Sequence, residues 1–222
     1  NYVDVPDTGD YESSILEFIS GEEAVQGQLE MGDGALFGDA IQLSQRYMAT
    51  VSDRMLVVVD IPRACECILY DRYLGMFGSG AGISQQLLFP DKLIMSMDDY
   101  SLLKEHIDDF RAFGFDISFC DEHTIEVLGL PADFTATPVE ELVYELLDAL
   151  RDQTGEGSQL RRLRVAAAMA RLGSVSRMRN MGTEELKSLL DQLERCSSPS
   201  FTPSGNAVMT IFAAEEIRRR LK

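Results

Sequence analysis

The sequence predicts an α+β protein, and three observations support this fold class. Apolar residues alternate, or run without interruption, in several stretches of strand length. Between these stretches they recur every three or four residues over the length of a helix. Gly155 and Gly157 interrupt the pattern and predict a hinge in the 222-residue chain, which is long enough for one large domain or two small ones.

The composition is that of an ordinary globular protein, with 45 % hydrophobic and 26 % charged residues. No apolar run approaches the ~20 residues that cross a membrane, and no secretory leader is visible. The four cysteines lack the spacing of a disulfide framework, which favours a reducing compartment. We therefore expect a cytoplasmic protein without a membrane partner.

The formal net charge of −17 argues against a protein whose whole surface binds a phosphate backbone. The charge is unevenly distributed. Residues 1–45 carry ten acidic residues and no lysine or arginine, whereas residues 151–222 carry 13 basic and 8 acidic residues. Two interpretations of the basic part stay open. Its arginines can line solvated helix faces, or some can form a local DNA-facing patch, because charges act within a Debye length of ~8–10 Å.

The chain begins with a polar segment, and the first predicted strands follow it. Residues 1–38 predict a flexible acidic linker because they are polar and contain six glycines. Over residues 40–51 apolar side chains alternate, with Gln45 breaking the set, and predict a strand. The continuous apolar run 55–59 predicts a second strand, covered on both faces. A helix follows from Pro62, whose missing N–H costs nothing in a first turn.

A small α+β unit is predicted within residues 86–152. An extended segment leads to a helix with Asp98 and Asp99 in its first turn, where carboxylates complement the helix dipole. Gly114 is expected to end that helix. Strands are then expected at 115–119 and 124–128, followed by a helix that is capped by Thr137 and runs from Pro138 to Leu150.

The last third is predicted to be mostly helical. A helix is expected over 158–172, where the run Ala166–Ala168 permits close approach of a neighbouring helix. Thr183 is expected to cap the next helix. The remaining elements are a loop at 197–205, a strand at 207–212 and a terminal helix at 213–222 with a basic end.

Three carboxylates near the first strand–helix corner form one candidate site: Asp60 at the strand end, and Glu66 and Asp71 on the next helix. Such a group can hold a hard divalent cation for phosphodiester chemistry. Glu66 and Asp71 are five residues apart, however, and so lie ~140° apart around a helix. Two interpretations stay open. The corner is purely structural, or it belongs to a divergent metal-dependent endonuclease that recruits Cys196 from the other end of the chain.

The segment Gln85–Pro90 is the second candidate, as a site for a partner. An extended stretch with a leading glutamine, apolar residues and a closing proline is typical of short peptides that dock into a hydrophobic pocket. The expected binding residues are Gln85, Leu87, Leu88, Phe89 and Pro90. The alternative is an edge strand whose alternate residues Leu87 and Phe89 belong to the core. The sequence contains no phosphate-binding glycine loop, Ser/His/Asp set or zinc knuckle, so no cofactor is expected.

These candidates fall in a pattern that resembles the C-terminal domain of the DNA mismatch repair protein MutL. Residues 57–71 read Val-Val-Val-Asp-Ile-Pro-Arg-Ala-Cys-Glu-Cys-Ile-Leu-Tyr-Asp. In that family a strand ends in Asp-Gln-His-Ala and continues into a helix reading Ala-His-Glu-Arg-Ile-Leu-Tyr-Glu. Residues 85–90 fall at the family's sliding-clamp-binding segment, 129–131 at its Val-Pro turn and 198–205 at its C-terminal loop.

The resemblance implies a two-part architecture. A dimerisation subdomain, a helix-packed sheet, joins residues 39–85 to 156–222, and a smaller external α+β subdomain is inserted at 86–155. It also implies a homodimer, with the replication sliding clamp and the mismatch-recognition protein MutS as partners and DNA bound through the full-length protein. The family's ATPase lies on an N-terminal domain. We expect the helix at 158–172 and the strand at 207–212 to lie close to the dimer interface.

Many members of the family nick DNA with the motif Asp-Gln-His-Ala-x-x-Glu-x-x-x-x-Glu and a late Cys-Pro-His segment. In this sequence Asp60, Glu66 and Asp71 stand at the acidic positions, Ile61, Pro62 and Arg63 replace the Gln, His and Ala, and Thr202 and Ser204 replace the late Cys and His. Histidine and cysteine supply the nitrogen and sulfur donors of a zinc-type site. The resemblance therefore implies a scaffold without a metal, a cofactor or nicking activity of its own.

Overall fold

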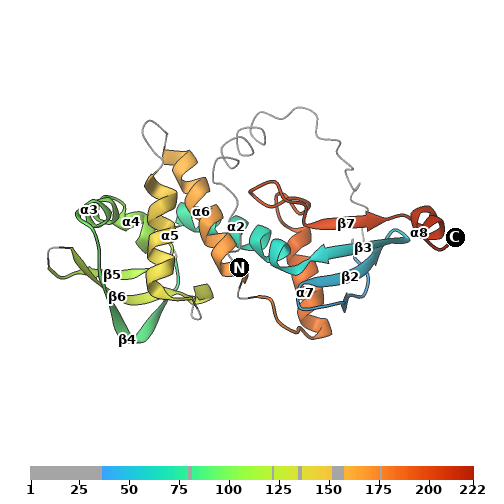
Figure 1. The fold of residues 1–222 in the computed structure, drawn as a ribbon, viewed down its shortest axis with the longest axis horizontal. Coiled ribbons are helices and arrows are strands. Elements are labelled where there is room, and N and C mark those ends of the chain that lie inside the picture. The colour runs from blue at the N-terminus through green and yellow to red at the C-terminus, as the bar shows by residue number, and fades with distance from the viewer. Residues whose placement is uncertain (1–36, 80–81, 122, 135–136, 152–157, 176) are drawn as a thin grey trace, which may run out of the picture. The chain divides into compact units, whose positions relative to one another are not determined.

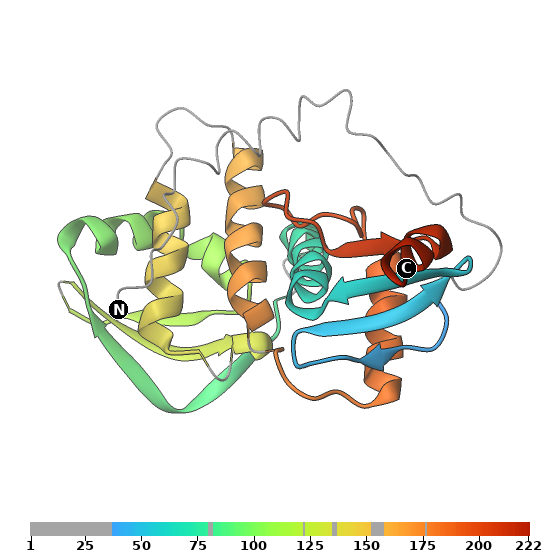
Figure 2. The ribbon, with the colours of Figure 1, turned by 45° about the vertical axis from the view of Figure 1, so that its right-hand side comes forward.

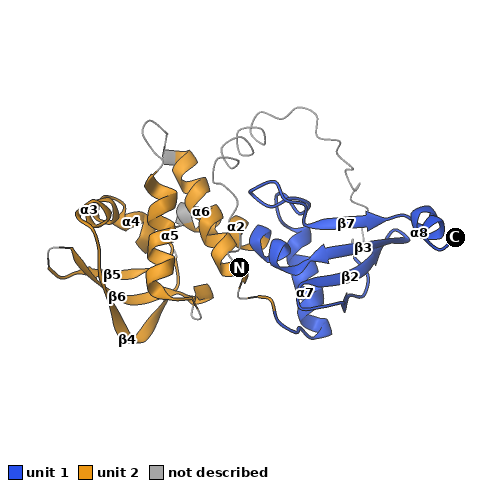
Figure 3. Ribbon diagram, viewed as in Figure 1, with its two compact units in different colours: residues 1–67, 179–222 blue, residues 68–178 orange. Residues whose placement is uncertain are grey.

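The computed structural model describes residues 37–222 except 80–81, 122, 135–136, 152–157 and 176. The linker predicted at 1–38 lies almost wholly outside the described residues, as does the hinge predicted at Gly155 and Gly157. The chain forms two compact units. The first contains the described residues up to Cys67 together with Arg179–Lys222, and the second is Ile68–Met178 (Figure 3). The second unit is thus an insertion in the sequence of the first.

The first unit is built on a four-stranded antiparallel sheet of order β1-β2-β3-β7 (Figure 1). Its strands are β1 (Ile41–Gln42), β2 (Tyr47–Ser52), β3 (Met55–Asp60) and β7 (Met209–Phe212). The single strand predicted over 40–51 is wrong, because β1 and β2 pair with each other around a turn. Ser44 makes this turn, since its Oγ accepts hydrogen bonds from the backbone N–H groups of Arg46 (3.3 Å) and Tyr47 (3.2 Å).

Helices cover one face of this sheet. In Figure 2, α7 (Thr183–Glu194) passes behind the strands. Its apolar stripe is buried and consists of Leu186, Leu189, Leu190 and Leu193. On the covered face of the sheet Met48, Val57 and Val59 are completely buried. The other helices with residues in this unit are α2 (Ile61–Ser79), which starts directly after β3, and α8 (Ala214–Arg220), which follows β7.

The predicted start of α7 is displaced by one residue. Thr183 is its first helical residue, and Gly182 takes the cap position. The N–H of Gly182 donates a hydrogen bond to the Glu185 carboxylate (3.0 Å). The glutamate therefore fastens the first turn from inside the helix, which makes a capping hydroxyl at position 182 dispensable.

The second unit packs helices on a three-stranded antiparallel sheet of order β4-β6-β5. Its elements are β4 (Ser84–Ile94), α3 (Met97–Glu105), α4 (Ile107–Ala112), β5 (Asp116–Phe119), β6 (Thr124–Pro131), the 3₁₀ turn η1 (Ala132–Phe134), α5 (Val139–Arg151) and α6 (Ser158–Val175). Leu146 and Leu147 of α5 and Ala166 and Met169 of α6 belong to one continuous apolar core. The small residues of α6 thus permit close packing within this unit.

The helix predicted to run as far as Gly114 is two helices, because the chain leaves helical geometry at His106 between α3 and α4. Gly114 follows α4 with a φ of +98°, a conformation that favours glycine, which agrees with its predicted place at the helix end. Asp98 and Asp99 lie in the first turn of α3, as predicted.

The mixture of helices and antiparallel sheets confirms the predicted α+β class. The compact units do not share the limits of the predicted subdomains, because α2 from Ile68 onward and all of α6 belong to the inserted unit. The dimerisation and external roles assigned to the two subdomains stay predictions. Within the described part of the chain, no helix combines the length and the apolar character that a membrane span needs.

Candidate functional site

Asp60 lies at the corner where β3 ends and α2 begins. The residue is buried, with 6 % of its surface exposed. Its backbone N–H donates to the carbonyl of Val208 (2.9 Å), and the N–H of Ile61 donates to the carbonyl of Arg46 (2.7 Å). The corner is therefore fixed by backbone bonds to the residue that precedes β2 and to the segment that enters β7.

The Asp60 carboxylate is engaged by two arginines. Arg46 donates from Nε to Oδ2 (2.9 Å), and the Nε of Arg63 lies 3.8 Å from the same oxygen. The backbone N–H of Arg63 donates to Oδ1 (3.2 Å), three residues into the helix, which is the geometry of an N-cap. The hydrogen bond to Asp60 and the negative charge of Asp60 raise the pKa of Arg46 above its ordinary value. A metal ion bound to this carboxylate would be repelled by both guanidinium groups.

The other two predicted carboxylates do not complete a metal site with Asp60. Glu66 is buried on α2 in the first unit, whereas Asp71 is half-buried on the stretch of α2 that belongs to the second unit. No group of three or more histidine, cysteine, aspartate or glutamate side chains within the described residues is arranged to hold a metal ion. Cys196, the further ligand considered from the sequence, donates from Sγ to the carbonyl of Gln192 (3.4 Å) at the end of α7.

The loop at 197–205 reaches the same corner of the first unit. Cys67 of α2 donates from Sγ to the carbonyl of Phe201 (3.3 Å). Thr202 is buried, and its Oγ1 lies 2.9 Å from Oγ of Ser204. The Ser204 hydroxyl also accepts from Nδ2 of Asn206 (2.9 Å). The two hydroxyls at the late positions therefore bond within their own loop.

Residues 87–90 bulge out of β4, which is an edge strand of its sheet. Gln86 lies opposite Gly129 and Asp91 lies opposite Val127, so four residues of β4 face the single residue between those two on β6. Surplus residues on one strand of an antiparallel pair bend that strand and leave the ladder. The bulge therefore lifts the centre of the predicted docking segment away from the sheet.

The bulge divides the apolar side chains of this segment. Leu88 is 87 % exposed and Phe89 is 79 % exposed, whereas Leu87 is half-buried and packs against the core of the second unit. Gln85, Gln86 and Pro90 are exposed, and Nε2 of Gln86 donates to the Asp116 carboxylate (3.0 Å). The alternative of a plain edge strand is wrong for Phe89, which lies outside the core, and holds for Leu87.

The sheet of the first unit has a second feature that the sequence reasoning missed, an apolar face opposite α7. By the strand register, this face carries Ile41, Tyr47, Ala49, Val51, Leu56, Val58, Thr210 and Phe212, a set that we call the open sheet face. Ile41 is 62 % exposed and Val51 is 54 % exposed. The prediction that the strand at 55–59 is covered on both faces is wrong for the single chain, because Leu56 and Val58 are only half-buried. The unbroken apolar run at 55–59 is nevertheless the feature of the sequence that indicates an apolar surface on this second face of the sheet.

The geometry of the two units defines a class of domain. The sheet of the first unit presents an apolar face, the second unit displays an apolar strand bulge, and a carboxylate corner is held by arginines. These are features of an α+β interaction domain. A family model described as "MutL C terminal dimerisation domain" matches residues 40–181, and the chain belongs to this family.

Individual relatives agree with this assignment. The chain is 29 % identical over 177 residues to the DNA mismatch repair protein MutL of Bacteroides fragilis, which covers 80 % of this chain and 28 % of the relative. It is 31 % identical over 176 residues to the protein of the same name from Chloroherpeton thalassium, covering 79 % of this chain and 28 % of the relative. A Clostridium botulinum relative of that name is 25 % identical over 181 residues, covering 82 % of this chain and 27 % of the relative. The chain thus spans less than a third of the length of these curated relatives.

The role of Asp60 as a cap and counter-ion predicts different costs for two substitutions. Asp60→Ala removes both functions and is expected to lower the free energy of unfolding by about 2 kcal/mol, about 1 from the cap and up to about 1 from the ion pairs of the part-exposed arginines. Asp60→Asn keeps a capping oxygen and is expected to cost less than about 1 kcal/mol. Urea unfolding with an unchanged slope measures both values. Equal losses for the two variants would contradict the capping role.

Proposed function

We propose that the chain is the dimerisation and sliding-clamp-docking module of a MutL-like DNA mismatch repair protein and has no nicking activity of its own. Two copies of the chain form a homodimer. The replication sliding clamp binds the bulge of β4, while MutS and DNA are partners of the full-length protein. The open sheet face carries this proposal, because an apolar sheet surface of this kind needs a cover.

The composition of the open sheet face supports a second copy of the chain as that cover. Large contiguous apolar patches are rare on monomeric soluble proteins and mark sites of association. Sheets pack face to face when the inner side chains of both are apolar, as Ile41, Val51 and Leu56 are. A two-fold axis brings the same surface of both subunits together, so one self-complementary face is sufficient. The family description names dimerisation as well.

The bulge of β4 supports clamp docking through its display of apolar side chains. Leu88 and Phe89 are largely exposed, whereas the preceding residue Leu87 is half-buried and packs against the core of the second unit. This arrangement presents two large side chains on a fixed support, so little conformational entropy is lost when they enter a pocket. Gln85 lies on the same strand, is exposed and offers its amide group to a partner.

The surroundings of Asp60 support the absence of nicking. A catalytic metal would need several oxygen or nitrogen donors around a carboxylate that is open to it. Arg46 and Arg63 already neutralise Asp60. Thr202 and Ser204 offer only hydroxyl groups, and these hydroxyls are hydrogen-bonded to each other within one loop. The endonuclease alternative would require all of these partners to rearrange.

A charge placed on the open sheet face is expected to break the dimer. Wild-type chain at micromolar concentration is expected to sediment as a dimer. Val51→Asp is expected to raise the dimer dissociation constant at least about 30-fold, since a hot-spot loss of about 2 kcal/mol corresponds to that factor. Val175→Asp on α6 is the matched control, because Val175 is exposed to nearly the same extent, 58 % against 54 %. A monomeric wild type, or equal effects of the two variants, would refute the proposed face.

Removal of the bulge side chains is expected to weaken clamp binding and to leave dimerisation intact. Leu88→Ala combined with Phe89→Ala is expected to weaken binding to a purified sliding clamp at least about 10-fold, as measured by surface plasmon resonance. Ile94→Ala is the control, because Ile94 lies on the same strand outside the bulge and is 81 % exposed. Unchanged clamp affinity in the double variant would exclude the bulge as the docking site.

The absence of nicking is tested with supercoiled plasmid and Mn²⁺. We expect no more relaxed plasmid than in a protein-free sample, because two arginines occupy the Asp60 carboxylate. Asp60→Asn and, as a control acid, Asp91→Asn are assayed in parallel. Metal-dependent nicking that disappears in Asp60→Asn and persists in Asp91→Asn would establish the endonuclease alternative instead.

A further inference from the structure

α8 presents a cluster of cations at one end of the sheet of the first unit. The helix contains no buried residue, and Arg218, Arg219, Arg220 and Lys222 are all exposed. Arg220 is engaged, since its Nη2 lies 3.1 Å from Oε1 of Glu216 and its guanidinium lies over the ring of Phe212. Arg218, Arg219 and Lys222 form no salt bridge with an acidic side chain of the described residues.

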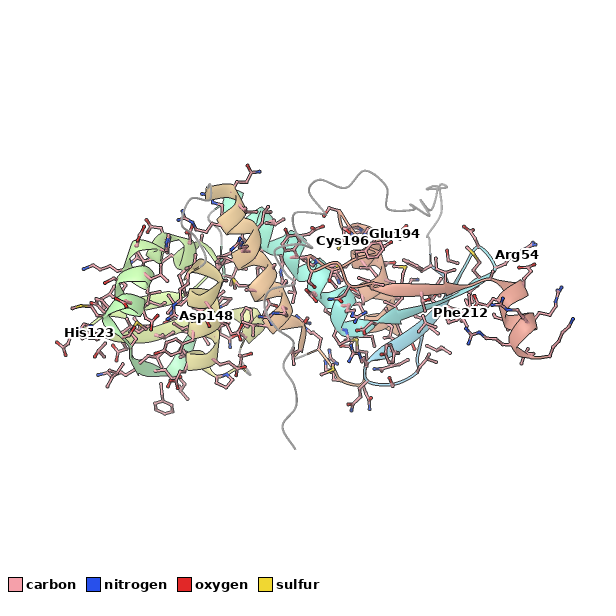
Figure 4. All side chains as sticks on the ribbon, turned by 45° about the horizontal axis from the view of Figure 1, so that its top comes forward. Arg54, His123, Asp148, Glu194, Cys196 and Phe212 are labelled. Atoms are coloured by element: carbon pink, nitrogen blue, oxygen red, sulfur yellow. The ribbon has the colours of Figure 1, made fainter. Side chains whose placement is uncertain are left out.

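A further cation lies at the same end of the sheet. The register pairs Leu56 with Phe212, so the turn between β2 and β3 lies beside the start of α8. Figure 4 labels Arg54 of this turn and Phe212 at the α8 end of the unit. Arg54 is exposed and has a φ of +64°. We call Arg54, Arg218, Arg219, Arg220 and Lys222 the α8 cluster.

The acidic residues around the α8 cluster do not cancel it. Among the described residues, the acidic residues of these two segments are Asp53 in the turn and Glu215 and Glu216 in the first turn of α8. Glu216 is paired with Arg220, and Glu215 lines a shallow recess together with Arg218, Arg219 and Lys222. The five cations of the α8 cluster outnumber these three carboxylates, and a local excess of positive charge attracts an anion within a Debye length of ~8–10 Å.

We propose that the α8 cluster binds the phosphate backbone of duplex DNA without reading its sequence. This inference rests on the proposed function in mismatch repair and adds a DNA contact within this domain. Arginine suits the ligand, because its guanidinium donates two parallel hydrogen bonds to a phosphate. The ring of Phe212 next to the cluster lies under the Arg220 guanidinium and so does not serve as a platform for an unpaired base.

The apolar content of α8 argues against an anionic membrane as the ligand. Membrane-surface helices insert an apolar face beside their basic face. α8 has seven residues, and its apolar side chains are those of the small Ala214 and of Ile217, which is half-buried. Leu221 directly follows the helix and is 82 % exposed. Among the described residues 213–222, no other large apolar side chain is mostly exposed. A single such residue is insufficient for insertion.

The inference is tested by fluorescence anisotropy with a labelled duplex and the 222-residue chain. The charge-removing variant is Arg218→Gln, Arg219→Gln and Lys222→Gln combined. The matched control removes three exposed cations elsewhere with Lys104→Gln, Lys187→Gln and Arg195→Gln. At low salt, the charge-removing variant is expected to bind at least about 10-fold more weakly than the control variant. Its slope of log affinity against log salt is expected to be shallower by about two to three per bound protomer.

The outcomes separate this inference from the proposed function. Loss of DNA binding in the charge-removing variant, with unchanged sedimentation as a dimer and unchanged clamp affinity, supports the α8 cluster. Equal affinity of the two variants for the duplex would overturn it and leave the proposed dimer and docking sites untouched. Binding to vesicles of anionic phospholipid without binding to the duplex would overturn it as well. Equal thermal melting of the variants verifies that the comparison concerns folded protein.

Discussion

The hydrogen-bonded corner around Asp60 is the constraint on which the first unit depends. Its carboxylate joins Arg46, which precedes β2, to Arg63 in the first turn of α2. Arg63 also donates from Nη1 to the carbonyl of Ala207 (2.7 Å), and the backbone of Asp60 bonds to Val208. Segments about 140 residues apart in the chain are thereby held at one point. β7 consequently completes the sheet beside β3, which extends the open sheet face to the second edge strand.

Local sequence patterns predicted most elements and could not predict this corner. Apolar periodicity locates β3, α5 and α7 because each of them buries a regular stripe or row. The partners of Asp60 lie in other elements and are polar, so no periodicity marks them. The same limit explains the first strand, where the alternation over 40–51 continues through a turn that one serine hydroxyl creates. The spacing of apolar residues therefore predicts which side chains are buried in strands and helices. It does not predict where the chain turns, because the turns depend on hydrogen bonds of polar side chains.

The docking segment was likewise predicted only in part from the sequence. Its composition alone marked Gln85–Pro90 as a candidate, but strand periodicity assigned Leu87 and Phe89 to one face. The bulge breaks that period, so Leu87 enters the core while Leu88 and Phe89 are displayed. A two-residue period holds only while each residue has one partner on the next strand. For the carboxylates at 60, 66 and 71 the sequence was more informative, since a separation of five residues already places Glu66 and Asp71 ~140° apart around α2.

The corner also shows how the chain accommodates a buried carboxylate with its own cations. An isolated buried carboxylate is costly, so it requires a positive partner whether or not catalysis is retained. Arg63 stands at a position where the resembling motif has alanine, and its side chain lies within 3.8 Å of Asp60. A guanidinium on the chain itself thus offers the positive charge that a bound cation would otherwise offer. It does so at every metal concentration and without an open coordination position, which agrees with the scaffold role proposed for this domain. Asp60 thereby caps α2 and joins the two ends of the unit, and both roles are independent of any reaction.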